Sequence, residues 1–408
     1  MTESRVDSGY AWIRLAAAMV IGTIGGVGMW SPVVVVPAVQ AEFGIARAEA
    51  ALPYTLTMIG FVFGTVLMGR LADKRGIMTP LLIATVVMSA GYAVAAYSPT
   101  FWIFAIVSGV AIGMLGSAAL FAPLLADTSL WFEKRRGLAI ALCAAGNYVA
   151  GTIWPPVLEH FIAEVGWRQT HLYTGLFCLV TMLPLALILR PRPPLLKPAA
   201  EAAAAAGFVR PLGLHPNFIQ GCIVIMGLAC CVAMSMPQVH IVAYCVDLGY
   251  GPARGAEMLS LMLGFGIVSR LASGWILDRI GGLKTLLLGS TLQMLALALY
   301  LPFDGLMSLY IISAIFGLVQ GGIVPSYAFI VRELFPASQA GFRVSLAISS
   351  TLAGMALGGW LSGKIFDLTG SYQAALLNGI TWNLLNVLIA AWLLWRQTGQ
   401  RRGAAAPA

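Results

Sequence analysis

The chain has 408 residues, of which 59% are hydrophobic and only 10% are charged, and its formal net charge is +8. A soluble domain usually carries about 25% charged residues, so this composition excludes an ordinary soluble enzyme. It favours a protein that crosses a membrane many times.

Twelve long apolar runs follow one another along the chain. Each is close to the length of about 20 residues that a helix needs to cross a bilayer. We therefore predict an all-α membrane protein with twelve transmembrane helices. The runs cover residues 12–39, 50–69, 78–97, 101–127, 137–161, 169–190, 217–246, 255–277, 284–302, 306–330, 342–365 and 373–395.

The longest polar gap, residues 191–216, contains several prolines, an alanine run and three basic residues. It divides the runs six and six. We predict that residues 191–216 form a cytoplasmic linker between an N-terminal six-helix half, residues 1–190, and a C-terminal six-helix half, residues 217–408.

Lysine and arginine are distributed unevenly between alternate loops. If the N-terminus is cytoplasmic, the outer segments contain only Arg47, Arg168, Arg254 and Lys364, and most other basic residues fall inside. Cytoplasmic loops of membrane proteins carry such an excess. We expect a multi-pass protein of the plasma or inner membrane with both termini in the cytoplasm, and the bias explains the net charge without a nucleic-acid partner.

Residue patterns for bound cofactors are missing from the sequence. The six cysteines all fall in predicted spans and lack metal-ligand spacing, and no group of His, Asp and Glu suggests a metal or hydrolytic site. No nucleotide-binding motif is found either. We expect no metal and no cofactor, and we expect any transport to run on solute gradients.

One short motif occurs twice. "GRLADKRG" at 69–76 and "GWILDRIG" at 274–281 match at Gly, Asp and Gly, and each follows the second run of its half. Similarly, "WFEKRRG" at 131–137 and "LFPASQAG" at 334–341 follow the fourth runs. Two repeats in the same orientation imply a pseudo-two-fold axis along the membrane normal, with the substrate between the halves near mid-membrane.

The repeated motif resembles the loop between helices 2 and 3 of the major facilitator superfamily. The resemblance implies that Asp73, Arg75, Asp278 and Arg279 have gating or structural roles at the cytoplasmic side. The alternative is a charged turn that only fixes the topology.

Three further stretches are similar to the monocarboxylate transporters, a group that also takes in bacterial oxalate–formate-type exchangers. They are "DSGYAW" at 7–12, "WFEKRRGLAIALCAAG" at 131–146 and "LSGKIFDLTGSYQ" at 361–373. The resemblance implies a secondary active transporter of a small monocarboxylate or related organic anion, working by alternating access. Coupling would be proton symport or anion exchange.

Arg270 is a charged residue in the middle of an apolar run. The helical pitch puts it on one stripe with Gly266 and Gly274. Small residues let a neighbouring helix approach closely or leave room for a ligand, so Arg270 should face the bundle. A guanidinium matches a carboxylate with two parallel hydrogen bonds. By resemblance, Arg270 stands where the family has its substrate-anion ligand; the alternatives are snorkelling to the inner surface and a structural ion pair.

The sequence departs from the eukaryotic members of the family at two places that belong to their proton pathway. Gly266 stands where they carry an aspartate, and the first run lacks their lysine. His240, deep in a span, is a candidate proton carrier because its pKa lies in the useful range, or it is a packing residue. Asp127, near the end of the fourth run, is a rival carrier or a structural acid.

Several uncharged residues are candidate substrate ligands. Asn147, Gln320, Tyr54 and Tyr327 could hydrogen-bond a carboxylate or hydroxyl, or could only bridge helices. Phe121 stands where family members often have a tyrosine, which favours a more apolar substrate.

Two other classes of function stay open. One is a carrier of the same fold for a neutral or drug-like solute, and the other is a non-transporting sensor with a carrier fold. The expected partners are a small organic anion, the lipid bilayer and, as a candidate coupling ion, the proton. We expect a monomer.

Overall fold

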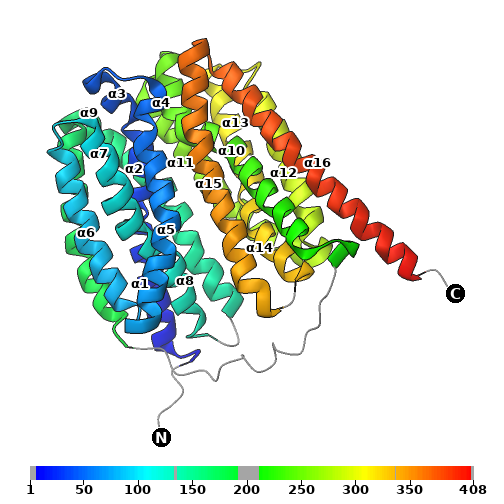
Figure 1. The fold of residues 1–408 in the computed structure, drawn as a ribbon. Coiled ribbons are helices and arrows are strands. Elements are labelled where there is room, and N and C mark those ends of the chain that lie inside the picture. The colour runs from blue at the N-terminus through cyan, green and yellow to red at the C-terminus, as the bar shows by residue number, and fades with distance from the viewer. Residues whose placement is uncertain (1–5, 133–135, 192–210, 336, 406–408) are drawn as a thin grey trace, which may run out of the picture. The chain divides into compact units, whose positions relative to one another are not determined.

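The computed structural model describes residues 6–132, 136–191, 211–335 and 337–405. These residues form helices joined by short turns, with no strand among them (Figure 1). Eleven helical stretches are long and apolar enough to cross a membrane. The stretch Leu138–Ile188 is two helices that meet at Gly166, where φ is 81° and ψ is 159°. The prediction of an all-α membrane protein with about twelve spans is therefore confirmed.

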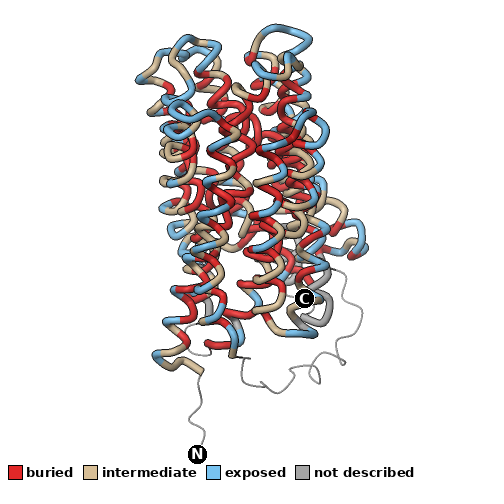
Figure 2. The backbone as a smooth tube through the Cα atoms, turned by 90° about the vertical axis from the view of Figure 1, so that its left-hand side faces the viewer, coloured by how far each residue is buried: buried red, intermediate tan, exposed pale blue. Residues whose placement is uncertain are grey.

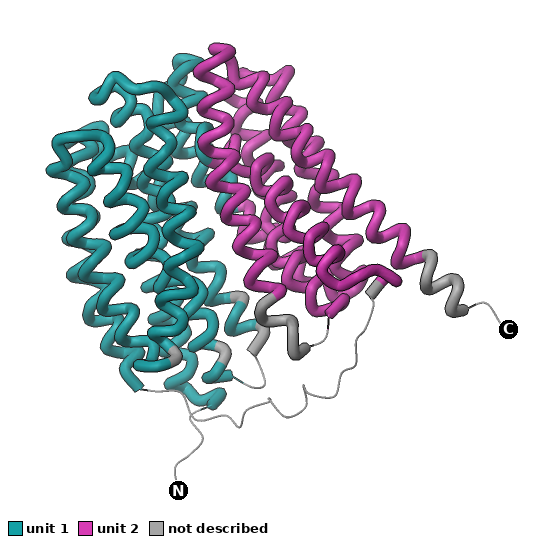
Figure 3. The backbone as a smooth tube through the Cα atoms, viewed as in Figure 1, with its two compact units in different colours: residues 1–196, 239–264 teal, residues 197–238, 265–408 magenta. Residues whose placement is uncertain are grey.

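The chain forms two compact units (Figure 3). Unit 1 contains residues 1–196 and 239–264, and unit 2 contains residues 197–238 and 265–408. These units differ from the predicted halves, which divide the chain at a single linker, residues 191–216. The six-helix halves therefore stay a prediction. Residues 192–210, most of the predicted linker, lie outside the described residues.

Most helices of unit 1 come from the first 190 residues. They are α1 Gly9–Gly25, α2 Val27–Val34, α3 Val36–Phe43, α4 Arg47–Ala50, α5 Leu52–Arg75, α6 Met78–Ala96, α7 Phe101–Val107, the π-helix η1 Ser108–Gly116, the 3-10 helix η2 Ser117–Leu120, α8 Ala122–Ser129 and α9 Arg136–Ile188. Helices α1 and α2 make one span, which bends at Gly26, and α3 follows it after Val35; α7 to α8 make another span.

Unit 2 contains the remaining helices, although α10 and α11 pass from one unit to the other. They are the short 3-10 helix η4 Pro211–Gly213, α10 Pro216–Asp247, α11 Pro252–Ile280, α12 Gly282–Leu299, α13 Leu306–Gln320, α14 Ile323–Leu334, α15 Ala337–Thr369 and α16 Tyr372–Ala405. Buried and exposed positions alternate along most helices of both units, as expected of helices with one face on neighbours and another on lipid (Figure 2).

The repeated sequence motif ends on the same backbone conformation in both units. Gly76 has φ 84° and ψ 161°, and Gly281 has φ 84° and ψ 167°. Only glycine adopts this region without strain. The motif therefore encodes a sharp turn between consecutive spans, from α5 to α6 and from α11 to α12.

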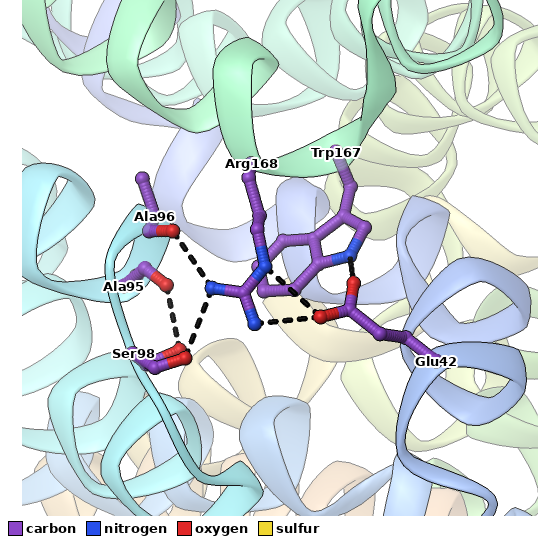
Figure 4. Close-up of polar contacts among 6 residues, drawn as sticks. All are labelled: Glu42, Ala95, Ala96, Ser98, Trp167 and Arg168. Atoms are coloured by element: carbon purple, nitrogen blue, oxygen red, sulfur yellow. Dashed lines mark hydrogen bonds and ion pairs between the residues drawn. The ribbon is translucent and has the colours of Figure 1, made fainter.

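A cluster of polar contacts joins three helix ends of unit 1 (Figure 4). Arg168 donates from Nε and Nη2 to Glu42 Oε1, at 3.0 and 2.7 Å, and from Nη1 to the carbonyls of Ala96 and Ser98. Trp167 donates to the other Glu42 oxygen. Partial burial alone would raise the pKa of the Glu42 carboxyl. The hydrogen bonds from Arg168 and Trp167 lower the pKa by more than burial raises it, so the net pKa lies below the usual value.

A second ion pair in unit 1 joins residues 200 positions apart. Arg47, at the start of α4, donates from Nη1 and Nη2 to the two carboxylate oxygens of Asp247, at 3.1 and 3.0 Å. Arg47 is buried and Asp247 is partly exposed. Both ends of such a fork-to-carboxylate contact are fixed in orientation, so the C-terminal end of α10 is held against the turn before α5.

Candidate functional site

Arg270 lies in the unit 2 part of α11, and its side chain is half-buried. Val268, Leu271 and Trp275 on the same helix are each more than half exposed, at 54%, 59% and 59%. These three positions form the lipid-facing side of α11. Arg270 is less exposed than these three residues, whereas Gly274 of the predicted stripe is itself exposed.

A break in the neighbouring span lies against Arg270. Helix α13 ends at Gln320 and α14 begins at Ile323, with Gly321 and Gly322 between them. The Nε–H of Arg270 donates to the carbonyl of Gly321 at 3.4 Å. This long bond uses one of the five N–H donors of the guanidinium.

The close approach of the two spans depends on glycine. A Cβ at Gly321 would collide with the Gly266 carbonyl oxygen, and a Cβ at Gly322 would collide with the side chain of Ser273. The small residues beside Arg270 therefore admit the α13–α14 junction rather than leave a gap. Small residues on this stripe could either let a neighbouring helix approach or leave room for a ligand. At Gly266 and Ser273 the structure shows close helix contact.

Gln320 is fully buried at the end of α13, directly before that junction. Its Oε1 accepts from Gln238 Nε2 at 2.6 Å, whereas its own Nε2 is buried without a partner. An unpaired buried amide donor costs roughly 1–3 kcal/mol. Gln320 therefore has unused hydrogen-bonding capacity at the break, but no open surface.

Tyr327 lies in a buried polar network of unit 2. Its hydroxyl donates to the Met226 carbonyl at 2.9 Å and lies 3.2 Å from Asn386 Oδ1, and Asn386 in turn donates to Ser290 Oγ. These bonds all run between helices. Of the two roles left open for Tyr327, these contacts fit the bridging of helices.

Tyr54 and His240 are both buried in unit 1. Tyr54 lies in the first turn of α5, and His240 lies in α10, three residues after Pro237. His240 has no exposed surface, so a proton would have to reach it through a movement of its surroundings. Neither residue belongs to the wall of the pocket described next.

A small pocket lies inside unit 1, and it is lined by Asn147 and Phe121, two of the predicted ligands. Its empty space, including the part open to solvent, is about 300 Å³. Two of the lining residues, Asn147 and Ser117, have side-chain oxygens that can form hydrogen bonds. The other lining residues are Gly22, Gly26, Met29, Phe61, Leu120, Phe121 and Cys143.

The pocket lies where the fourth span loses its α-helical form. Helix η1 is a π-helix that gives way to the 3-10 helix η2 at Ser117, and Phe121 lies outside both with φ −125° and ψ −85°. Irregular segments inside a membrane are tolerated where protein or a cavity covers them, and π-turns are frequent at functional sites. Phe121 thus lies at a break rather than in a regular helix.

Asp127 makes a buried ion pair that the sequence did not predict. Arg14 of α1 donates to Asp127 Oδ2 from Nη2 at 2.8 Å and from Nε at 3.2 Å, and the two side chains are only 2% and 8% exposed. The Arg14 guanidinium also lies 4.5 Å from the centre of the Trp131 ring, and its Nη1 has no partner.

The same contact brings two of the sequence signatures together. The backbone N–H of Asp7 donates to the Trp131 carbonyl at 3.0 Å, Tyr10 packs edge-on against Trp131, and Trp12 packs edge-on against Phe132. "DSGYAW" and the "WF" of "WFEKRRG" therefore dock on each other. Residues 133–135 of the second signature lie outside the described residues.

The predicted gating residues lie at helix ends. Arg75 and Asp278 are exposed, and Arg279 is exposed with its guanidinium 3.7 Å from the centre of the Trp275 ring. Asp73 is in α5, but its side chain lies outside the described part of the chain. Among the described residues, no group of three or more His, Cys, Asp and Glu could hold a metal ion.

A family model described as the Major Facilitator Superfamily matches residues 18–327. Among characterised proteins, the chain is 26% identical to rat "Monocarboxylate transporter 13" over 381 residues, which cover 90% of this chain and 85% of that protein. It is 27% identical to mouse "Monocarboxylate transporter 11", covering 91% and 84% of the two chains.

Two solved structures share the fold. A mutant of the nucleoside transporter NupG matches with a TM-score of 0.69 at 15% identity, covering 94% of this chain and 99% of that one. A bacterial homologue of the human lysosomal transporter Spinster matches with a TM-score of 0.71 at 16% identity, covering 98% and 100%.

Proposed function

Because the chain belongs to the major facilitator superfamily, we propose that it is a secondary active transporter of a small monocarboxylate or related organic anion. The family makes it a multi-pass membrane transporter and not an enzyme. Transport would proceed by alternating access, with proton symport or anion exchange. The mammalian relatives named as monocarboxylate transporters support this choice of cargo.

The observation that carries the proposal is the position of Arg270. A lipid-facing arginine at this depth would cost at least about 2.5 kcal/mol, and Arg270 avoids the lipid side of α11. It lies instead beside an interrupted helix, against the Gly321 carbonyl. A guanidinium keeps its charge at any physiological pH and recognises a carboxylate with two parallel bonds. Arg270 is the residue that we propose as the anion ligand.

Asn147 and Phe121 are proposed to contact the uncharged part of the cargo, because both line the pocket of unit 1. Gln320 and Tyr54 stay proposals as ligands, and Tyr327 is better explained by its buried bonds. His240 and Asp127 stay proposals as proton carriers, with Asp127 the weaker candidate because it already holds a buried arginine.

A thermal-shift screen of short monocarboxylates on the purified protein tests the proposal. Acids that bind should raise the melting temperature of the wild type, by mass action, and fail to raise that of Arg270→Ala. Arg254→Ala is the matched control, because Arg254 is an exposed arginine near the other end of the same helix. If neutral solutes stabilise the protein and carboxylates do not, the neutral-solute carrier replaces this proposal.

Uptake into proteoliposomes separates a transporter from a sensor. A carboxylate that binds should accumulate when a proton gradient or a counter-anion is supplied, without nucleotide. Binding without accumulation under either condition would favour the non-transporting sensor.

The orientation in the membrane is a separate proposal. The positive-inside bias places the basic loop that contains Arg135, and both termini, in the cytoplasm. A cysteine introduced at Arg135 should resist an impermeant thiol reagent added outside intact cells. Ready labelling there, with equal labelling after permeabilisation, would reverse the topology.

A further inference from the structure

Gln238 and Gln320 form a hydrogen bond between two buried amides of unit 2. The Nε2–H of Gln238 in α10 donates to Gln320 Oε1, at the end of α13, at 2.6 Å. Gln320 exposes none of its surface and Gln238 only 4%. A hydrogen bond away from water is electrostatically stronger than one at a surface, so this bond fixes the end of α13 against α10.

The other amide atom of Gln320 is buried without a partner. Turning both amides by half a rotation would exchange donor and acceptor and keep the bond, because an amide offers both. In either arrangement Gln320 uses one amide atom and leaves the other unpaired. The Gln320 side chain is therefore held in place by its bond to Gln238.

Both glutamines lie where a helix lacks part of its own backbone hydrogen bonding. Gln238 follows Pro237, which has no N–H to donate to the carbonyl four residues earlier. Gln320 is the last residue of α13, and the α13–α14 junction, Gly321 and Gly322, follows it. No side chain caps the first turn of α14. A side-chain bond therefore contributes more to the position of this junction than it would inside a regular helix.

The α13–α14 junction lies directly against Arg270. The Nε–H of Arg270 donates to the Gly321 carbonyl at 3.4 Å. A Cβ on Gly321 would lie only 3.1 Å from the backbone nitrogen of Arg270, so the two main chains are in close contact as well. The junction thus touches both the backbone that carries Arg270 and the guanidinium itself. A displacement of the junction would change where the guanidinium is held.

The orientation of the guanidinium decides how well it can bind a carboxylate. Two parallel bonds require the fork of N–H donors to match the two carboxylate oxygens in direction as well as in distance. Hydrogen bonds weaken steeply as their angle departs from linearity. A small change at the junction is therefore expected to lower carboxylate affinity without removing any group that touches the cargo.

We propose that Gln238 is a positioning residue for Arg270. Its bond to Gln320 holds the α13–α14 junction, and the junction holds the guanidinium in the orientation that a carboxylate needs. Gln238 acts through these two contacts and not by touching the cargo. The inference rests on the proposed function, because it takes Arg270 to bind the carboxylate of the cargo.

The test is a double-mutant cycle between Gln238→Met and Arg270→Lys. Methionine is unbranched like glutamine and fills similar space without an amide. The affinities of acetate, propionate and butyrate are taken from the rise of the melting temperature with acid concentration on the purified protein. The melting temperature without acid shows whether each variant is folded.

Gln293→Met is the matched control. Gln293 of α12 is also a fully buried glutamine of unit 2. Its Nε2 donates to the Cys230 carbonyl at 3.2 Å and its Oε1 has no partner. It therefore resembles Gln320 in using one amide atom and leaving the other unpaired, but its bond ends on the α10 backbone and not at the α13–α14 junction.

Gln238→Met alone should weaken the acid that binds best by roughly three- to tenfold, within the range of one neutral hydrogen bond. In the Arg270→Lys background the two parallel bonds are already lost, so Gln238→Met should change affinity by less than about twofold, close to the limit of additivity. Gln293→Met should leave affinity unchanged in both backgrounds. A role of Gln238 in stability alone would not produce this dependence on residue 270.

The possible failures are distinguishable. If no short monocarboxylate stabilises the wild type, or if Arg270→Lys binds as tightly as the wild type, the proposed function or the proposed role of Arg270 fails, and this inference fails with it. If Gln238→Met keeps wild-type affinity, weakens binding no more than Gln293→Met, or weakens it equally in both backgrounds, only the inference fails. If Gln238→Met does not fold, Gln238→Met/Gln320→Met, which leaves no unpaired amide at the site, replaces it under the same criteria.

Discussion

The buried pair of Arg14 and Asp127 allows a prediction whose size follows from the structure. Breaking a buried ion pair by removing one partner costs about 3–5 kcal/mol, because a charge is left in a medium of low polarity. Asp127→Leu should come close to the upper value. Arg14 already has one unpartnered nitrogen and would lose both remaining bonds at once, and a guanidinium cannot shed its charge.

The opposite substitution should cost less. In Arg14→Met the orphaned Asp127 can become neutral by taking up a proton, which limits the penalty of burial. The double variant Arg14→Met/Asp127→Leu removes both charges and fills the site with apolar groups. Its free energy of unfolding should therefore equal that of the wild type or exceed it by about 1–4 kcal/mol. The exposed pair Arg254–Glu257 is the control, and breaking it should cost no more than about 1 kcal/mol.

The free energy of unfolding in detergent, measured for all four members of the double-mutant cycle, decides the matter. The expected result is a coupling energy of several kcal/mol and the order Asp127→Leu, Arg14→Met, double variant from least to most stable. If the double variant lost as much free energy of unfolding as the two single variants together, the two side chains would not be coupled and the stabilising ion pair would be refuted. Retained stability in Asp127→Leu with loss of pH-dependent uptake would instead identify Asp127 as the proton carrier.

Three further predictions follow from other contacts. Gly321→Ala should lower both stability and carboxylate affinity, since its Cβ would collide with the Gly266 carbonyl, whereas Gly274→Ala, with open space around it, should do neither; equal effects would refute the role of close packing. Because the pKa of Glu42 is lowered by the fold, its pair with Arg168 stabilises above the unfolded pKa of about 4.3 and is lost as pH falls through the folded value. Glu42→Gln should therefore be less stable than the wild type by about 0.2–1 kcal/mol at pH 7, a small value since both groups are partly exposed to screening solvent, and this gap should narrow as pH falls below about 4.3; a gap in melting temperature that stays constant down to low pH would contradict this. His240→Gln should flatten the pH dependence of uptake and leave anion exchange largely intact, and an unchanged pH profile would remove His240 as a carrier.

Features that depend on local chemistry could be predicted from the sequence. Run lengths predicted the spans, and the repeated motif predicted equivalent turns, which the positive φ of Gly76 and Gly281 explains. The orientation of Arg270 toward the bundle was expected from helical pitch and stays a prediction. Each of these depends on residues close together in the chain.

Features that depend on distant residues could not be predicted. Arg14 and Asp127 are 113 residues apart, and nothing in the signatures beside them, at 7–12 and 131–146, indicates that the two side chains touch. The break in the fourth span could not be predicted either. The π-helix η1 gives way to the 3-10 helix η2 at Ser117, and the sequence there contains only glycines of a kind common in apolar spans.

The central claim is that Arg270 binds the carboxylate of the cargo, and one measurement tests it most directly. The affinity of the best carboxylate should be measured for the wild type, Arg270→Lys and the control Arg254→Lys. Lysine keeps the charge but cannot form two parallel bonds, and losing one charged hydrogen bond costs about 1.5–3 kcal/mol. We predict that Arg270→Lys weakens binding by roughly 10- to 150-fold, with Arg254→Lys unchanged; near-normal affinity in Arg270→Lys would contradict the claim.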